Sequence, residues 1–379
     1  MKSYGNLMTT YISDDNYYLS IKNACKNKRH NRQKKRACYI KAHKEELKEY
    51  FINYAIHFFN MPHTPKKIND GTSKKIRSII VPTMEEQVIH HMVVNTLMPM
   101  FTKGMYEHTY GSVPGRGTHK AKKQIEKWIK TDKRGMKYCL KMDIRKYFDS
   151  IPHDIIKEKL TAKIRDKEFL NIVLTIIDAT EVGLPLGFYT SQWLANWYLQ
   201  DLDHYIKETL GANHFIRFVD DMIIFDSNKR KLHYAVRNIK AYLKNELGLD
   251  LKDNWQVFLF DYVKDGEHKG RALDFLGFKF YRDRTILRKS IMLKATRKAK
   301  KISKKKQKTI YDARQMLAYL GYIDCTDTYN MYLKYIKPNV NFRYLKRYTS
   351  MYQKRLNRRS NPNGMVSRRK CKSGRACRN

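Results

Sequence analysis

Three aspartates stand in two similar settings and could act together. Asp220 and Asp221 lie in the middle of the apolar stretch FIRFVDDMIIF, residues 215–225, and Asp143 ends the strand-like stretch YCLKMD, residues 138–143. An ionised carboxylate is costly to bury without a partner. Two adjacent carboxylates between apolar segments therefore need either solvent or a cation.

The apolar flanks of the Asp-Asp pair predict two strands joined by a tight turn, with both aspartates at the tip. An ordinary surface hairpin is the simplest alternative. Two-residue hairpin turns favour Asn-Gly or Asp-Gly, however, because both central residues need positive φ, and Asp-Asp has no such advantage. If the strand that ends in Asp143 lies beside this hairpin, the three carboxylates converge and repel one another unless a cation neutralises them.

The chemistry that fits this cluster is nucleotidyl transfer. Oxygen-only ligands with room for water and phosphate suit Mg²⁺. Two such ions, about 3.5–4 Å apart, would activate a hydroxyl nucleophile and stabilise a leaving pyrophosphate. The pattern predicts Asp143, Asp220 and Asp221 as the catalytic and metal-binding side chains, with two Mg²⁺ ions and Mn²⁺ as a substitute.

The composition favours a polyanionic partner. The 379-residue chain has 77 Lys and Arg against 36 Asp and Glu, a formal charge of +41. Hydrophobic residues make up 42%, so we expect a globular protein with two or three subdomains. The positive excess predicts salt-dependent binding to nucleic acid. An acidic membrane surface is the alternative, but no isolated amphipathic basic helix supports it.

The location predicted from the sequence is the cytoplasm. The first residues lack the apolar segment of a signal peptide, and no apolar run approaches membrane-spanning length. Six cysteines show no pairing pattern, which favours reduced thiols. Cys371 and Cys377 lie in the basic tail without further ligands at metal-binding spacing, so we expect no zinc site there.

Helical and strand-like segments are interspersed without strict alternation, which favours an α+β fold. A turn at Asp70-Gly71 is expected before a short strand. Helical periodicity marks the segments 41–59, 84–101, 119–130, 153–178, 191–210 and 229–247, and strand-like runs cover 76–81, 138–144, 215–225, 253–260 and 272–281.

Two stretches of the sequence resemble motifs of a known protein family. KMDIRKYFDSI, residues 141–151, resembles the first aspartate motif of reverse transcriptases, and RFVDD, residues 217–221, resembles the second. Phe218 stands where that family usually has Tyr, a change that keeps the ring and loses a hydroxyl. Further similar motifs follow in the family's order over about residues 1–350: KKIRSIIVP, TYGSVPGRGTHKA, GLPLGFYTSQ, ALDFLGF and the basic helices after 285.

The resemblance implies a right-hand polymerase fold with a palm built on an antiparallel sheet. The segments that it implies are an N-terminal basic helical extension (1–65), fingers (66–137), a palm (138–284, with part of the fingers at 153–190), a helical thumb (285–350) and a basic, disordered tail (351–379).

Roles near the incoming nucleotide follow from the same resemblance. Arg77 and Lys75 would hold the triphosphate, and the backbone carbonyl of Ile144 would join the aspartates at the metal. Phe148 would pack beneath the sugar and exclude a 2′-hydroxyl, with a plain core aromatic as the alternative. Leu186 stands where other reverse transcriptases have a glutamine that hydrogen-bonds near the nucleotide, so its apolar side chain is a physical source of low fidelity.

The remaining roles concern template, primer and product. Gly187 and Gln192 would belong to the nucleotide-binding site, in the motif that grips template and primer, although Gln192 could equally serve only to start a helix. Lys252 would assist the departure of pyrophosphate. Leu276 and Gly277 would form the primer grip.

The pattern Gly-X-X-X-Ser-Gln at Gly187, Ser191 and Gln192 resembles one subgroup, the reverse transcriptases of diversity-generating retroelements. Those enzymes copy a template-repeat RNA in an error-prone way, chiefly at adenines, with a small basic accessory protein. The implied partners are template RNA, RNA/DNA heteroduplex and deoxynucleoside triphosphates. Two alternatives stay open: an intron-type or antiphage reverse transcriptase, and a non-catalytic RNA-binding protein with a polymerase fold, which the three aspartates disfavour.

Overall fold

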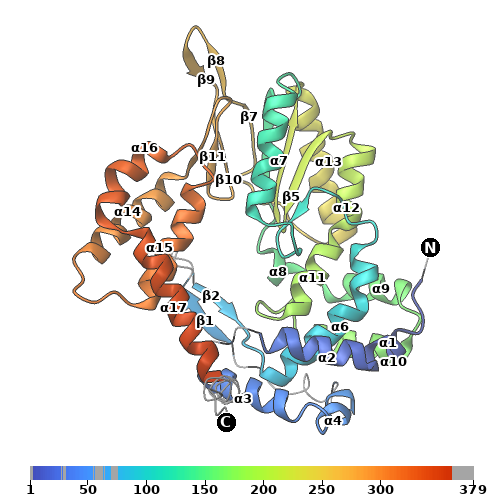
Figure 1. The fold of residues 1–379 in the computed structure, drawn as a ribbon. Helices are drawn as coiled ribbons and strands as arrows, with labels where there is room; N and C mark the ends of the chain where they lie inside the picture. Colours follow the sequence, from blue (N-terminus) through green and yellow to red (C-terminus); the bar gives the residue numbers. More distant parts are fainter. Residues whose placement is uncertain are drawn as a thin grey trace, which may run out of the picture. The chain divides into compact units, whose positions relative to one another are not determined.

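The computed structural model describes residues 3–26, 28, 31–53, 55, 63, 65–69 and 76–360. The chain divides into two compact units, Met1–Leu259 and Phe260–Asn379 (Figure 1). No described helix is both long and apolar enough to cross a membrane. Some predicted features lie outside the described residues: Lys75, the Asp70-Gly71 turn, Cys371, Cys377 and all of the tail beyond 360.

The first unit combines a two-stranded sheet and a five-stranded mixed sheet with helices. Its strands are β1 (Lys66–Asn69), β2 (Ile76–Ile79), β3 (Thr109–Tyr110), β4 (Tyr138–Asp143), β5 (His214–Phe218), β6 (Asp221–Asp226) and β7 (Gln256–Leu259). Its helices are α1 (Leu7–Ile12), α2 (Asp14–Ala24), α3 (Asn31–Ala42), α4 (Lys48–Asn53), α6 (Met84–Thr102), α7 (Thr118–Thr131), α8 (Tyr147–Ser150), α9 (His153–Lys163), α10 (Lys167–Ile177), α11 (Tyr189–Tyr198), α12 (Gln200–His204) and α13 (Lys229–Leu247), with a π-helical turn at Tyr205–Thr209.

The sheet that matters for the site has the strand order β3-β5-β6-β4-β7. β3 runs parallel to β5, and the other neighbours are antiparallel. The helix α13 packs against β4, β6 and β7, and α7 packs against β3 (Figure 1). The consecutive residues Met222–Phe225 of β6 are all buried, as expected for a central strand that is covered on both faces.

The helix boundaries follow local signals. α6 begins with a capping box, in which the Thr83 hydroxyl accepts from the Glu86 N–H and the Glu86 carboxylate accepts from the Thr83 N–H. α13 begins at the side-chain cap of Asn228 and ends at Gly248, which has a φ of 60°.

The second unit has two small sheets and a helical part. Its strands are β8 (Tyr262–Lys264), β9 (Glu267–Lys269), β10 (Leu273–Phe275), β11 (Phe278–Phe280) and β12 (Thr285–Leu287), arranged as β8-β9 and β10-β11-β12. Its helices are α14 (Lys289–Ser303), α15 (Ile310–Ile323), α16 (Tyr329–Met331) and α17 (Phe342–Ser360), with a π-helical turn at Tyr332–Ile336 and a 3₁₀ turn at Lys337–Asn339.

The α+β class predicted from the sequence is confirmed, but several predicted elements are subdivided. The helices predicted over 153–178 are α9 and α10, the second of which begins at the Asp166 cap. The helix expected over 191–210 contains the break between α11 and α12. The strand expected over 272–281 is a hairpin, β10 and β11, because Leu276 and Gly277 form its turn.

Candidate active site

The sheet register brings the three aspartates together at one end of β4 and β6. Asp143 is the last residue of β4 and is the direct cross-strand partner of Asp221, the first residue of β6. Asp220 precedes Asp221 in the turn, and its carbonyl oxygen accepts a hydrogen bond from the Ile144 N–H at 3.4 Å. The predicted convergence of the two motifs is therefore what the strand pairing produces.

The predicted position of the turn was wrong by one residue. Phe218 pairs with Asp221, so the two turn residues are Val219 and Asp220, and Asp221 already belongs to a strand. Val219 carries a φ of 58°, a backbone conformation that glycine adopts freely and a β-branched residue adopts at a cost of about 1–3 kcal/mol. Such strain persists where the surroundings hold the residue in place.

The electrostatics of the three carboxylates fit a cation. Oδ1 of Asp143 is buried and has no hydrogen-bond partner among the residues that the structure describes. Burial, with further contributions from Asp221 and Asp143, raises the pKa of Asp220 to about 7. A divalent cation held by Asp143, Asp220 and Asp221 would relieve the repulsion and give the orphaned oxygen a partner.

Lys252 supplies a positive charge that contacts Asp143. Its ammonium donates to Oδ2 of Asp143, and its backbone N–H donates to the Asp143 carbonyl oxygen at 2.9 Å. The two contacts place Lys252 at the edge of the carboxylate cluster. Ile144, whose carbonyl the sequence predicts as a ligand, is fully buried directly after Asp143.

The segment from Leu184 to Gly187 is fixed against two other predicted site elements. The Leu184 N–H donates to the Phe148 carbonyl oxygen at 2.7 Å, and the Leu186 carbonyl oxygen accepts from the Ile80 N–H at 2.8 Å. Gly187 has a φ of 114°, and a Cβ there would lie 2.0 Å from the Ile80 carbonyl oxygen. Only glycine allows this approach of the loop to the chain that leads into α6.

The predicted nucleotide and template residues lie in the same unit. Phe148 is half-buried in α8, and Arg77 is exposed on β2. Gln192 is exposed in the first turn of α11. Gly187 and Gln192 line one cavity of about 300 Å³, together with Pro82, Gln87, His91 and Tyr189.

The predicted primer-grip residues belong to the second unit. Leu276 and Gly277 form the two-residue turn between β10 and β11, with φ values of 52° and 87°. Asn-Gly is the usual choice for such a turn, so a leucine at positive φ is strained. Gly277 also lies close to Ile291, because a Cβ there would be 2.7 Å from the Ile291 Cδ1 atom.

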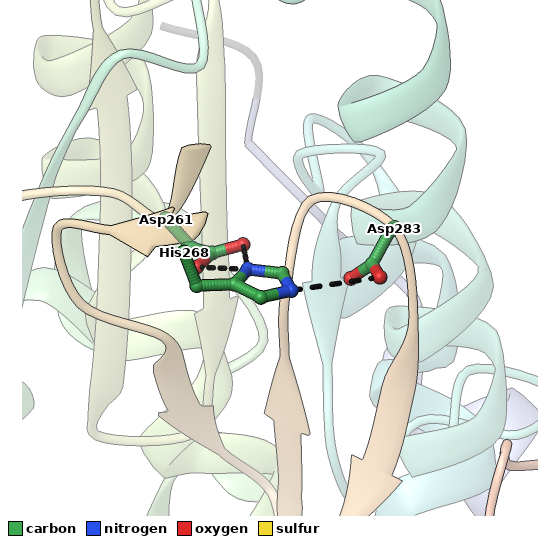
Figure 2. A group of neighbouring side chains, drawn as sticks. All are labelled: Asp261, His268 and Asp283. Atoms are coloured by element: carbon green, nitrogen blue, oxygen red, sulfur yellow. Dashed lines mark hydrogen bonds and ion pairs between the residues drawn. The ribbon is translucent and has the colours of Figure 1, made fainter. Parts of the chain in front are cut away.

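A second acidic group occurs in the second unit at Asp261, His268 and Asp283 (Figure 2). Nδ1 of His268 lies 2.8 Å from Asp261, while Nε2 faces Asp283 at 3.6 Å. A guanidinium N–H of Arg284 already contacts both Asp283, at 2.8 Å, and Nε2, at 3.2 Å. The Arg284 guanidinium thus already supplies a positive charge to this group. The cluster is therefore explained as a set of hydrogen bonds that joins β9 to the turn before β12.

The sequence reasoning missed a buried ion pair beside the aspartate turn. Arg217 and Asp203 both have fully buried side chains and lie 2.6 Å apart. The available signal was the charge itself, since Arg217 interrupts an otherwise apolar strand three residues before Asp220. A buried arginine must be paired, and the sequence alone offers no way to choose its partner.

The raised pKa of Asp220 predicts a pH-dependent response to divalent cations. The folded carboxyl, with a pKa of about 7, holds its proton more tightly than an unfolded aspartate, whose pKa is about 3.9. Its contribution to stability is therefore complete below about pH 4 and is lost as the pH rises through about 7. We expect Mg²⁺ to raise the melting temperature clearly at pH 8 and only slightly at pH 5.5, as measured by scanning calorimetry.

The matched control for that response is Asp220→Asn. This variant keeps the size of the side chain but does not ionise, so it should flatten the pH dependence and weaken the Mg²⁺ effect at pH 8. An equal Mg²⁺ stabilisation of the natural chain at both pH values would contradict the role assigned to Asp220.

Comparisons with known proteins agree on the family. Residues 64–280, more than half of the chain, match the family described as "Reverse transcriptase (RNA-dependent DNA polymerase)". The chain is 26% identical over 219 residues to the "Retron Ec73 reverse transcriptase" of Escherichia coli, covering 54% of this chain and 66% of that protein. It is 26% identical over 197 residues to the "Group II intron-encoded protein LtrA" of Lactococcus lactis subsp. cremoris, covering 49% and 32% respectively.

Among solved structures, a telomerase from Candida tropicalis with a fragment of telomeric RNA aligns with a TM-score of 0.46 at 12% identity, covering 81% of this chain and 55% of that one. The chain thus spans less than two thirds of the length of each of these three proteins. The match over residues 64–280 includes all three aspartates and both motifs that carry them. The chain belongs to the reverse transcriptase family.

Proposed function

We propose that this protein is an RNA-directed DNA polymerase that copies an RNA template into complementary DNA. The observation that carries the proposal is the cross-strand pair Asp143 and Asp221, with Asp220 beside it, in a chain of the reverse transcriptase family. When bound, two Mg²⁺ ions, or Mn²⁺ in their place, would supply Lewis-acid activation of the primer 3′-hydroxyl and charge stabilisation of the pyrophosphate.

The roles proposed for the other residues follow from their surroundings. Arg77 is exposed on β2, where its guanidinium can pair with a triphosphate. The carbonyl oxygen of Phe148 accepts from the Leu184 N–H, which fixes the backbone from which its ring would pack beneath a sugar. Lys252 contacts Asp143 and would be the nearest proton donor for the leaving pyrophosphate.

The proposed partners are template RNA, the RNA/DNA heteroduplex and deoxynucleoside triphosphates. The net charge of +41 supports backbone contacts along the nucleic acid and strong salt dependence. The proposed segments are the extension (1–65), fingers (66–137 with 153–190), palm (138–284), thumb (285–350) and tail (351–379). The proposed place of action is the cytoplasm, where RNA and nucleotides occur together.

Within the family, we place the protein with the enzymes of diversity-generating retroelements, which work with a small basic accessory protein. The support is the motif Gly187, Ser191 and Gln192, at the start of α11 beside a cavity of about 300 Å³. A retron or intron type is the second candidate, and the 26% identity to a retron enzyme and to an intron-encoded protein favours it. The neighbouring DNA separates the two: paired imperfect repeats that differ mainly at adenines would identify the retroelement, and their absence would favour the second candidate.

Error-prone copying is proposed from Leu186. A hydrogen bond from the Ile80 N–H fixes its backbone. Its side chain has no donor or acceptor, so it offers the nascent base pair no hydrogen bond that depends on correct geometry. The test is primer extension on a defined RNA template, followed by sequencing of the products. We expect misincorporation concentrated opposite adenine.

Replacing Leu186 by glutamine should lower misincorporation opposite adenine by about tenfold, the amount that one added polar contact contributes to discrimination. Val182→Gln is the matched control, because Val182 is exposed in the same loop and should leave the error rate unchanged. Equal error rates for Leu186→Gln and the natural chain would remove Leu186 as the source of low fidelity.

A further inference from the structure

Every N–H group of the Arg217 guanidinium donates a hydrogen bond near the aspartate turn. Its side chain has no exposed surface, and the guanidinium has five N–H groups. Two bonds of 2.6 Å reach the two carboxylate oxygens of Asp203. Two more reach Asn196, one to its side-chain oxygen at 3.2 Å and one to its carbonyl oxygen at 3.1 Å. The fifth reaches the carbonyl oxygen of Val219 at 3.0 Å.

That fifth bond falls on the strained residue of the turn. Val219 has a φ of 58°, and its carbonyl carbon is bonded directly to the nitrogen of Asp220. The Val219 N–H donates to the Tyr110 carbonyl oxygen at 3.1 Å. The peptide groups on both sides of the strained Cα atom are thus held by hydrogen bonds. One comes from the Arg217 side chain on β5 of the same hairpin and the other goes to Tyr110 on β3, so the orientation of the Asp220 backbone depends on Arg217 and β3.

Asp203 and Asn196 in turn fix the guanidinium and the strand beneath the turn. Asp203 also accepts from the Thr109 hydroxyl at 3.1 Å, and the Asn196 amide donates to the Gly111 carbonyl oxygen at 3.1 Å. Gly111 leaves no room for a side chain, because a Cβ there would lie 2.8 Å from Val219. The helices α11 and α12, the strand β3 and the turn therefore meet in one buried network.

We propose that Arg217 is a positioning residue for the metal-binding carboxylates: it holds the Val219 backbone, and through it Asp220, in the conformation that lets Asp220 share a cation with Asp143 and Asp221. The inference rests on the proposed function of that site. Asp203 and Asn196 act by holding Arg217, and none of the three touches the reacting groups. Charge alone is not sufficient for this role, since the contact to Val219 requires a planar group with several donors.

The experiment is Mn²⁺ binding by the full-length protein without nucleic acid, followed by electron paramagnetic resonance, with thermal unfolding measured on the same samples. Arg217→Met should weaken Mn²⁺ binding by about tenfold or more, the range found when groups that orient ligands are removed. Arg217→Lys should bind with intermediate affinity, because one ammonium cannot reproduce all five bonds. Mn²⁺ binding by a folded Arg217→Met protein that equals the natural chain would overturn the proposal.

Two further variants separate positioning from stability. Removing one partner of a buried ion pair destabilises a protein, whereas replacing both with apolar residues often does not. The double variant Asp203→Leu with Arg217→Met should thus regain thermal stability while Mn²⁺ binding stays weak. Asn16→Ala is the control for lost stability alone. It removes the hydrogen bonds that join α2 to Met92 and Thr96 of α6, so the melting temperature should fall while Mn²⁺ binding stays unchanged.

The same data distinguish this inference from the proposed function. If the natural chain binds Mn²⁺ but extends no primer, the polymerase proposal fails, and the inference is still decided by the binding of the variants. If the natural chain extends primers, and the double variant binds Mn²⁺ as tightly as the natural chain, the polymerase proposal stands and the positioning role of Arg217 is wrong.

Discussion

Replacing Asp221 by alanine should reduce RNA-templated primer extension by about 10³-fold or more. A metal ion's stabilisation of transition-state charge is worth several kcal/mol, and each 1.36 kcal/mol corresponds to a tenfold change in rate. Asp221 is the cross-strand partner of Asp143, so its loss removes one of the two carboxylates that face each other across the strands. The measurement is single-turnover extension of a DNA primer on an RNA template.

RNA affinity should change little in the same variant. The binding of the RNA backbone depends on many cations, and Asp221 is one charge in a chain of net charge +41. Asp226→Ala is the matched control, because Asp226 is the same residue type at the opposite end of β6 and pairs with Tyr138. Extension by Asp221→Ala at more than a tenth of the natural rate would exclude this carboxylate from the metal site.

Replacing Phe148 by alanine should admit ribonucleotides, with the preference for deoxynucleotides falling by about 10²-fold. The exclusion of a 2′-hydroxyl depends on bulk beneath the sugar, and steric rejection in a pocket is worth roughly 10–200-fold. Phe148 is half-buried and packs against the hydrophobic core, and the hydrogen bond from Leu184 to its carbonyl oxygen fixes the backbone that carries the ring. The measurement is the ratio of kcat/KM for each deoxynucleotide and its ribonucleotide.

General damage to the protein would lower kcat/KM for the deoxynucleotide and for the ribonucleotide together. It would therefore leave their ratio unchanged, so a change in the ratio reports on sugar selection alone. Tyr138→Ala is a suitable control, since Tyr138 is a half-buried aromatic residue at the other end of β4. An unchanged ratio in Phe148→Ala would show that the ring belongs only to the hydrophobic core, which is the alternative that its sequence position left open.

The convergence of the three aspartates could be predicted from the sequence. Both motifs have the same form, an apolar strand that ends in an acid, so pairing of the two strands brings the carboxylates together. The fold class, α+β with the right-hand polymerase fold, is confirmed by the observed elements and by family membership. The exact turn could not be predicted, because Val219 occupies a position whose positive φ sequence rules assign to glycine. A hydrogen bond from the buried Arg217 side chain to the Val219 carbonyl oxygen, and one from the Val219 N–H to the Tyr110 carbonyl oxygen, override that local preference.

The contacts that fix the site could not be predicted from the sequence either. Nothing in the residue pattern pairs Arg217 with Asp203, or places Gly187 against the carbonyl of Ile80, because both contacts join segments that are distant in the chain. The roles of Arg77, Gln192, Lys252 and the primer-grip residues Leu276 and Gly277 stay predictions, as do the segment boundaries.

The measurement that tests the central claim most directly is extension of a DNA primer on an RNA template by the full-length protein, with deoxynucleoside triphosphates and Mg²⁺ or Mn²⁺. The account predicts full-length complementary DNA that depends on the divalent cation and is lost in Asp221→Ala. Tight RNA binding without any extension under these conditions would contradict it, and would identify the protein as a non-catalytic RNA-binding member of its family.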